Sequence, residues 1–219
     1  MDNLRLLYFE FKNMRWKYFV PLIIIYIMVP LLSIRYAATI NFVSDAATLI
    51  VPPVYTDFER YIPIIAVWYF TLCFREYSNQ GALELVKAYG VKQKSDLIKT
   101  IFIWLHTVAL VGVLLIGYSF YMDNMFVMFV KIIIQMLFYL SFQYFVVKVT
   151  NSVLVPAIII TTYHLIFNFV YTKISIWNIF IYYNEITKSV LLNKYGLLAL
   201  MSLAMLIVGM NIDRKSYDE

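Results

Sequence analysis

The chain has 219 residues, of which 63% are hydrophobic and only 14% charged, and its net charge is +5. A soluble domain carries roughly 25% charged residues, because polar side chains must cover its surface. The apolar residues here form long blocks, which indicates an all-α integral membrane protein and argues against a soluble domain. The basic excess then fits Lys and Arg on loops beside anionic lipid better than it fits a nucleic-acid partner.

Residues 1–17 precede the first apolar block. Leu4, Leu7, Phe11 and Met14 recur at helical spacing. They share one face, which predicts an amphipathic helix lying in the membrane interface. A short solvated lead-in to the first span is the alternative. The apolar block that follows is longer than the h-region of a cleaved signal peptide, so we interpret it as a membrane helix.

Six apolar blocks predict six transmembrane helices in a single transmembrane domain, residues 1–219. A helix needs about 20 apolar residues to cross the hydrocarbon core, and the second block is shorter than that. Arg60 and Arg75 at its ends can snorkel outward and let it span. The expected spans are residues 18–34, 61–74, 100–121, 125–147, 153–171 and 195–212.

Lys and Arg are distributed unevenly between the two sides of these spans. Twelve fall on the side that carries the N-terminus and five on the other, with Lys131 inside the fourth span. Because basic residues accumulate on cytoplasmic loops, the count predicts a multi-pass protein of the cell membrane with both termini in the cytoplasm. Lys131 lies near the outer end of its span, and we expect its side chain to snorkel to the interface.

Two outer segments are long. Residues 35–60 are expected to form a loop that carries Asp57 and Glu59 and in which two prolines break any helix. Residues 174–184, with the sequence ISIWNIFIYYN, are apolar and aromatic but too short to span. They fit a re-entrant or an interfacial helix, and the sequence leaves that choice open.

The cytoplasmic loop 75–99 is the best candidate for a functional element. It contains a charge pair, a glycine that permits a bend, a stretch that can form a short amphipathic helix, and a second glycine placed to end that helix. Ser95 and Asp96 then fit the cap and first turn of the third span. A short helix held between two spans can dock on a soluble partner and transmit its movement to both spans. The residues of this element are Arg75, Glu76, Gly81, Leu83, Glu84, Leu85, Tyr89 and Gly90.

The loop resembles the segment between the second and third spans of ABC-2-type transporter permeases. Arg75-Glu76, Gly81, Ala82-Leu83-Glu84 and Gly90 carry the resemblance, and the layout of the whole chain is similar. In that family the segment is the coupling helix that docks on the ATPase subunit. The short second span and the small total size depart from the family pattern.

The resemblance implies a permease subunit of an ATP-driven exporter. Its substrate would be amphipathic, such as a peptide antibiotic, a lipid-like molecule or a drug. Its partners would be ABC ATPase subunits, which bind ATP and Mg, and a second permease chain, identical or related, within membrane lipid. The chain lacks a Gly-rich phosphate loop, so we expect it to bind no ATP or other cofactor itself. It also lacks the HExxH and GxSxG motifs, and we expect it to have no catalytic residues.

Polar side chains inside two spans form a second set of candidates. Thr161, His164 and Asn168 share a face of the fifth span, and Gln135 and Gln143 lie in the fourth. Polar groups at this depth face protein or water, not lipid. They either line a substrate path or subunit interface, or they form hydrogen bonds between neighbouring helices, which we favour. The two histidines lie on different spans without carboxylates, so no metal site is expected.

Other functions stay open. A six-span substrate-capture subunit of a nutrient importer would have an outward-facing pocket and no coupling helix in residues 75–99. A bacteriocin immunity protein of the membrane would need no ATPase. An intramembrane enzyme needs acidic or His groups close together within the spans, and the predicted spans contain almost no acids.

Overall fold

A computed structural model describes residues 11–12, 14–32, 34, 53–75, 94–121, 125–170, 179 and 191–215. These parts of the chain are helical and contain no β-strand, as the composition predicted. The elements are η1 (Arg15–Tyr18), α2 (Phe19–Ile23), η2 (Ile24–Met28), α4 (Pro53–Cys73), α6 (Lys94–Ser119), α7 (Met125–Thr150), α8 (Leu154–Leu165), η4 (Ile166–Val170), η5 (Leu191–Tyr195) and α10 (Gly196–Lys215).

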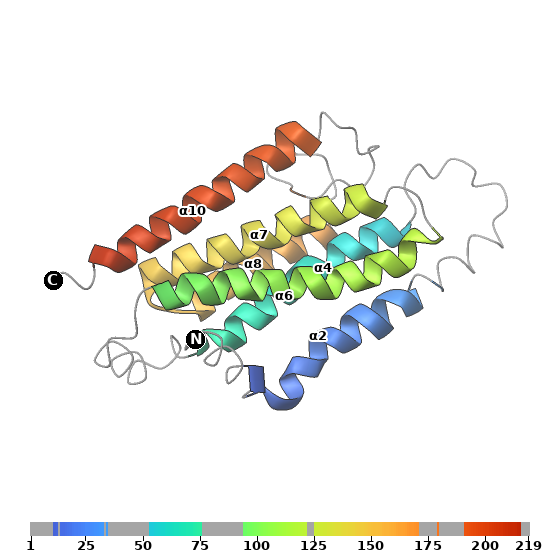
Figure 1. Ribbon diagram of the computed structural model, residues 1–219, viewed down its shortest axis with the longest axis horizontal. Coiled ribbons are helices and arrows are strands. Elements are labelled where there is room, and N and C mark those ends of the chain that lie inside the picture. The colour runs from blue at the N-terminus through green and yellow to red at the C-terminus, as the bar shows by residue number, and fades with distance from the viewer. Residues whose placement is uncertain are drawn as a thin grey trace.

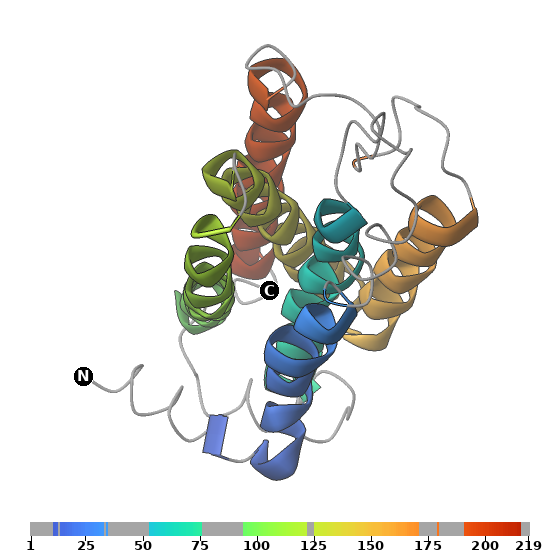
Figure 2. The same cartoon turned by 90° about the vertical axis from the view of Figure 1, so that its right-hand side faces the viewer.

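The helices run along a common axis and alternate in direction (Figure 1). α4, α7 and α10 begin at the right of Figure 1, whereas α2, α6 and α8 begin at the left. We call the first the Glu59 end and the second the Asp96 end, after a residue near the start of α4 and of α6. α4 and α7 lie at the centre of the bundle, because α7 packs on α4, α6, α8 and α10, and α4 also packs on α6, α8 and η2 (Figure 2).

Four helical stretches are long and apolar enough to cross a membrane. This confirms the prediction of membrane-length apolar helices. α8 is also apolar but short, with 12 residues before it continues as the π-helix η4. α4 is long enough, with 21 residues, but carries three charged side chains near its start. The four stretches are Arg15–Leu32, Asp96–Ser119, Met125–Thr150 and Leu192–Ile212.

α4 begins well before the apolar block that predicted it. The expectation that Asp57 and Glu59 lie in an outer loop is wrong, because both lie within α4 and are 2% and 1% exposed. Pro53 is the first residue of the helix. Its fixed φ favours the helix, and its lack of an N–H costs nothing there because the first N–H groups of a helix have no acceptor within it. The buried charges are therefore inside the bundle and need partners there.

The N-terminal residues that are described pack on the bundle. Met14 is 6% exposed, and the ring of Phe11 contacts the rings of Tyr18, Tyr69 and His106. The Tyr18 hydroxyl lies 3.2 Å from His106 Nε2. Part of the face predicted to lie in the lipid interface thus faces protein, and residues 1–10 of that predicted helix lie outside the described residues.

Helices α7 and α10 approach closely at Gly209. A Cβ atom built on Gly209 would lie 2.8 Å from a ring carbon of Tyr144, which is fully buried in α7. Small residues at membrane helix contacts let backbones approach and bring many atoms into van der Waals contact. The contact between these two helices, the most extensive in the bundle, therefore depends on the absence of a side chain at Gly209.

Candidate functional site

Buried charges mark two sites, one at each end of the bundle. A charge inside a membrane domain is costly unless it is paired, so paired charges there mark functional or strongly structural positions. At the Glu59 end, Glu59 of α4 pairs with Lys131 of α7, and each side chain is 1% exposed. At the other end, Asp96 of α6 pairs with Lys148 of α7. Helix α7 supplies the cation of both pairs.

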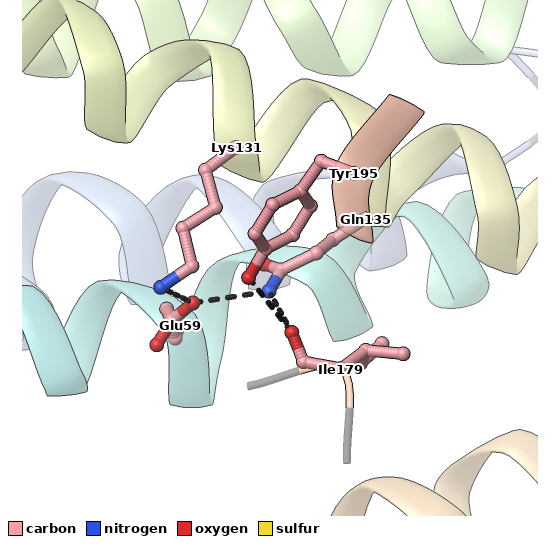
Figure 3. A network of polar contacts seen from close by, with 5 residues as sticks. All are labelled: Glu59, Lys131, Gln135, Ile179 and Tyr195. Carbon is pink, nitrogen blue, oxygen red and sulfur yellow. Dashed lines mark hydrogen bonds and ion pairs between the residues drawn. The ribbon is translucent and has the colours of Figure 1, made fainter. Parts of the chain in front are cut away.

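Gln135 extends the first pair into a network (Figure 3). Its Nε2 donates to Glu59 Oε1 at 3.0 Å and to the Ile179 carbonyl at 3.2 Å. The Tyr195 hydroxyl donates to the same carbonyl at 2.8 Å. The network therefore joins α4, α7, η5 and residue Ile179 through donors and acceptors that are removed from solvent, where each hydrogen bond is strong and each missing one is costly.

The prediction that Lys131 snorkels to the interface is wrong. Its ammonium group is buried against the Glu59 carboxylate and lies 5.8 Å from the centre of the Tyr195 ring, an arrangement that also allows a cation–π attraction. The physical reason is the early start of α4, which brings Glu59 into the bundle beside Lys131. The Glu59 carboxylate therefore stabilises the Lys131 ammonium group inside the protein, and the side chain does not need to reach water at the interface.

Ile179 is the one residue of the segment 174–184 that the structure describes. Besides the two hydrogen bonds at its carbonyl, its N–H donates to the Tyr163 hydroxyl at 3.2 Å, and the residue is 7% exposed. One point of the segment thus reaches into the bundle. The rest of it lies outside the described residues, so the choice between a re-entrant and an interfacial helix is not decided.

His164 connects three helices by hydrogen bonds. Its Nε2 lies 2.6 Å from the Arg60 carbonyl of α4, and its Nδ1 lies 3.0 Å from the Tyr139 hydroxyl of α7. Because a carbonyl can only accept, Nε2 carries a proton and donates to the Arg60 carbonyl. Asn168 is likewise buried, whereas Thr161 is exposed, so the three polar residues of the fifth block do not share one environment.

Thr161 instead lines a groove between α4 and α8, with a volume of about 240 Å³. Gln143 lies behind this groove and donates from Nε2 to the Thr71 hydroxyl at 3.5 Å. Its buried Oε1 has no hydrogen-bond partner among the described residues. The groove is mainly apolar, and it is lined by Ile64, Val67, Trp68, Thr71, Leu72, Ala157 and Thr161.

The Asp96 end holds the described part of the loop 75–99. Helix α6 has Asp96 in its first turn, as the sequence predicted, but it begins at Lys94, so Ser95 lies within the helix and is not its cap. Asp96 Oδ2 accepts from Lys148 Nζ at 2.6 Å. The carboxylate lies at the positive end of α6 and the ammonium group in the last turn of α7, so both helix dipoles favour the pair. Arg75 is exposed just after the end of α4, and residues 76–93, which include Glu76 and the other residues of the predicted coupling element, lie outside the described residues.

Replacing Lys148 with Met should destabilise the protein by about 2–3 kcal/mol, between the effects typical of exposed and of fully buried pairs, because it leaves Asp96 largely buried without its cation. Thermal unfolding in mild detergent measures the change. The exposed Thr150→Val, on the same helix turn, is the control and should cost less than about 0.5 kcal/mol. Equal effects of the two changes would show that the ion pair contributes nothing.

Sequence reasoning missed Glu59 and Tyr195 as members of the network. One signal was available for Glu59, because a lysine within an apolar block favours an acidic partner, and few acids flank the spans. Tyr195 carried no such signal, because tyrosine is common in this chain and suits the membrane interface.

Comparisons of the chain with protein-family models, with curated proteins and with solved structures found no match.

Proposed function

We propose that the chain is the permease subunit of an ATP-driven ABC exporter that moves an amphipathic substrate out of the cell. The main support for the proposal is the way in which helices α4, α6 and α7 are linked at the Asp96 end. The coupling loop leaves α4 at Arg75 and rejoins the bundle at the start of α6, whose Asp96 is paired with α7. Movement of a docked ATPase at this loop would therefore reach three helices at once.

In this proposal α4 and α8 also cross the bilayer, which makes six spans. The 21 residues of α4 extend about 31 Å, close to the thickness of the hydrocarbon core. The buried charge of Glu59 can be accommodated in a membrane span because it pairs with Lys131 and accepts a hydrogen bond from Gln135. The alternating directions of the helices place the start of η1 and the end of α10 at the Asp96 end, and the Lys and Arg count favours the cytoplasm for that end.

Helix α7 would connect the two ends during transport. Lys148 and Lys131 lie on this one helix, about 25 Å apart at 1.5 Å per residue. A rigid helix with an ion pair at each end can convey a displacement from the coupling loop to the Glu59 network. We infer that the network closes the outer end of the pathway in the resting state, because it joins α4, α7, η5 and Ile179 there.

The groove between α4 and α8 is the candidate substrate path. Its apolar walls would accommodate the hydrophobic part of an amphipathic molecule, and the hydroxyl groups of Thr71 and Thr161 would meet a polar group. Gln143 behind Thr71 offers an unused buried acceptor to the same region. In this arrangement His164 and Gln135 hold helices together and do not contact the substrate.

Co-purification with an ATPase tests the proposal. The chain, isolated in mild detergent from its native host, should bring an ABC ATPase subunit with it. Glu84→Ala and Leu85→Ala should each weaken that association on the order of tenfold and uncouple ATP hydrolysis from transport, while the unfolding temperature of the isolated permease stays unchanged. Asn79→Ala, in the same loop but outside the expected helix, is the control. Full association and transport in both loop variants would refute the coupling role.

A substrate-capture subunit of a nutrient importer is less well supported. That function requires an outward-facing pocket, which the proposed orientation places at the Glu59 end. The groove instead lies along the half of α4 toward the Asp96 end, from Ile64 to Leu72. No described contact favours a bacteriocin immunity protein over a permease.

A further inference from the structure

The entry to the first membrane helix presents a cluster of cations and aromatic rings. Lys12, Arg15 and Lys17 are exposed, and so are Trp16 and Phe19, at 68% and 58%. We call these five residues the basic patch. It lies at the start of the stretch Arg15–Leu32, where a membrane-crossing helix meets the headgroup region, at the Asp96 end of the bundle.

The backbone of the basic patch is held by neighbouring helices. The Trp68 indole N–H donates to the Lys17 carbonyl at 3.4 Å, and the Tyr69 hydroxyl donates to the Tyr18 carbonyl at 3.1 Å, both from α4. Met14 is buried within the patch's own segment. Because the backbone is already ordered, a ligand of the patch would bind without a large cost in conformational entropy.

Arg15 has a backbone conformation that arginine does not favour. Its φ is 49°, in the left-handed region, which Gly adopts freely and other L-residues adopt at a cost of roughly 1–2 kcal/mol. The side chain is exposed, so packing does not require arginine at this position. A strained residue whose side chain has no structural task suggests that the side chain serves binding.

The chemistry of the basic patch fits one class of ligand. No carboxylate among the described residues forms an ion pair with Lys12, Arg15 or Lys17. Guanidinium binds phosphate through two parallel hydrogen bonds, and ammonium groups add point charges. The exposed rings of Trp16 and Phe19 favour apolar surroundings. The glycerol and upper acyl region of a lipid would supply such surroundings, and a free phosphate ion would not.

We propose that the basic patch binds the headgroup of an anionic phospholipid. The three cations hold the headgroup phosphate, and the two rings lie beside the lipid's glycerol and first methylene groups. Each cation near an anionic surface strengthens binding about fivefold, so the three together contribute on the order of 100-fold. This inference requires only that the first helix enters a membrane, and it does not depend on the proposed export function.

Binding of phosphatidylglycerol and of phosphatidylcholine to the purified full chain tests the proposal, measured by native mass spectrometry in mild detergent. The triple variant K12Q/R15Q/K17Q should lose affinity for phosphatidylglycerol on the order of 100-fold, with phosphatidylcholine binding unchanged. The control R75Q removes one exposed cation outside the patch, just after the end of α4, and should stay within about threefold of the natural chain.

Arg15→Gly separates the backbone from the side chain. It should raise the unfolding temperature, because Gly relieves the left-handed strain, and still weaken phosphatidylglycerol binding about fivefold. A purely structural Arg15 would not produce that combination. Unchanged phosphatidylglycerol affinity in both R15G and the triple variant would overturn the proposal. Equally effective competition by soluble glycerol phosphate would overturn the assignment to a lipid.

Discussion

Replacing Lys131 with Met should destabilise the protein by about 3–5 kcal/mol, because it leaves the Glu59 carboxylate buried without its cation. Met has a similar length and no charge, so the change removes the ion pair with little loss of packing. Glu59 would keep the hydrogen bond from Gln135 at 3.0 Å, but a neutral amide donor compensates a carboxylate away from water less than an ammonium group does. Thermal and denaturant unfolding in mild detergent measure the loss.

The double variant Glu59→Gln with Lys131→Met is the decisive companion. It removes both charges and keeps an amide at position 59 that can accept from Gln135, so most of the lost stability should return. Arg60→Gln on the same helix is a control, because Arg60 is 28% exposed and its pair with Asp57 is loose, at 3.8 Å. If Lys131→Met costs no more than Arg60→Gln, the buried pair does not stabilise the bundle.

Replacing Gly209 with Leu should destabilise the contact of α10 with α7 by about 1–3 kcal/mol or more. The Cβ atom alone would lie 2.8 Å from the Tyr144 ring and 3.4 Å from the Cα atom of Phe145. Tyr144 is fully buried and cannot swing away, so α10 itself must shift. Thermal unfolding measures the effect.

Gly117→Leu is the matched control, because an added Cβ at Gly117 meets no atom within 4 Å and the residue is exposed near the end of α6. This change should be tolerated, since Leu favours a helix more than Gly does. Tyr144→Ala combined with Gly209→Leu should recover part of the loss by making room for the new side chain. Equal tolerance of Gly209→Leu and Gly117→Leu would show that α7 and α10 do not depend on their close approach.

Local sequence patterns predicted the helices well where the pattern was continuous. The blocks near 100–121, 125–147 and 195–212 became α6, α7 and α10, because long apolar runs without proline form helices in lipid wherever they lie. Asp96 was correctly placed in the first turn of α6, since its preference for that position is local. The start of α4 was missed, because its first turns carry charges that resemble a loop.

The candidate site residues also fall into two groups, those that the sequence pointed to and those that only the structure brought together. The loop 75–99 stands out from the sequence because its glycines and charges lie close together along the chain, and its assignment as a coupling helix stays a prediction. Apart from the hint that Lys131 needs an acidic partner, the Glu59 network could not be predicted from the sequence. Glu59, Lys131 and Tyr195 are far apart in sequence, and their meeting depends on how each helix is rotated about its axis.

The sequence alone determined that the chain forms apolar helices of membrane length, because its apolar excess is arranged in long blocks that suit lipid as the solvent. Only the tertiary structure decided which charges are buried together. The cost of a charge in an apolar interior depends on the partner within a few ångströms, and that partner comes from another helix. For that reason the sequence placed Glu59 in a loop, whereas the structure shows it within α4 as the partner of Lys131.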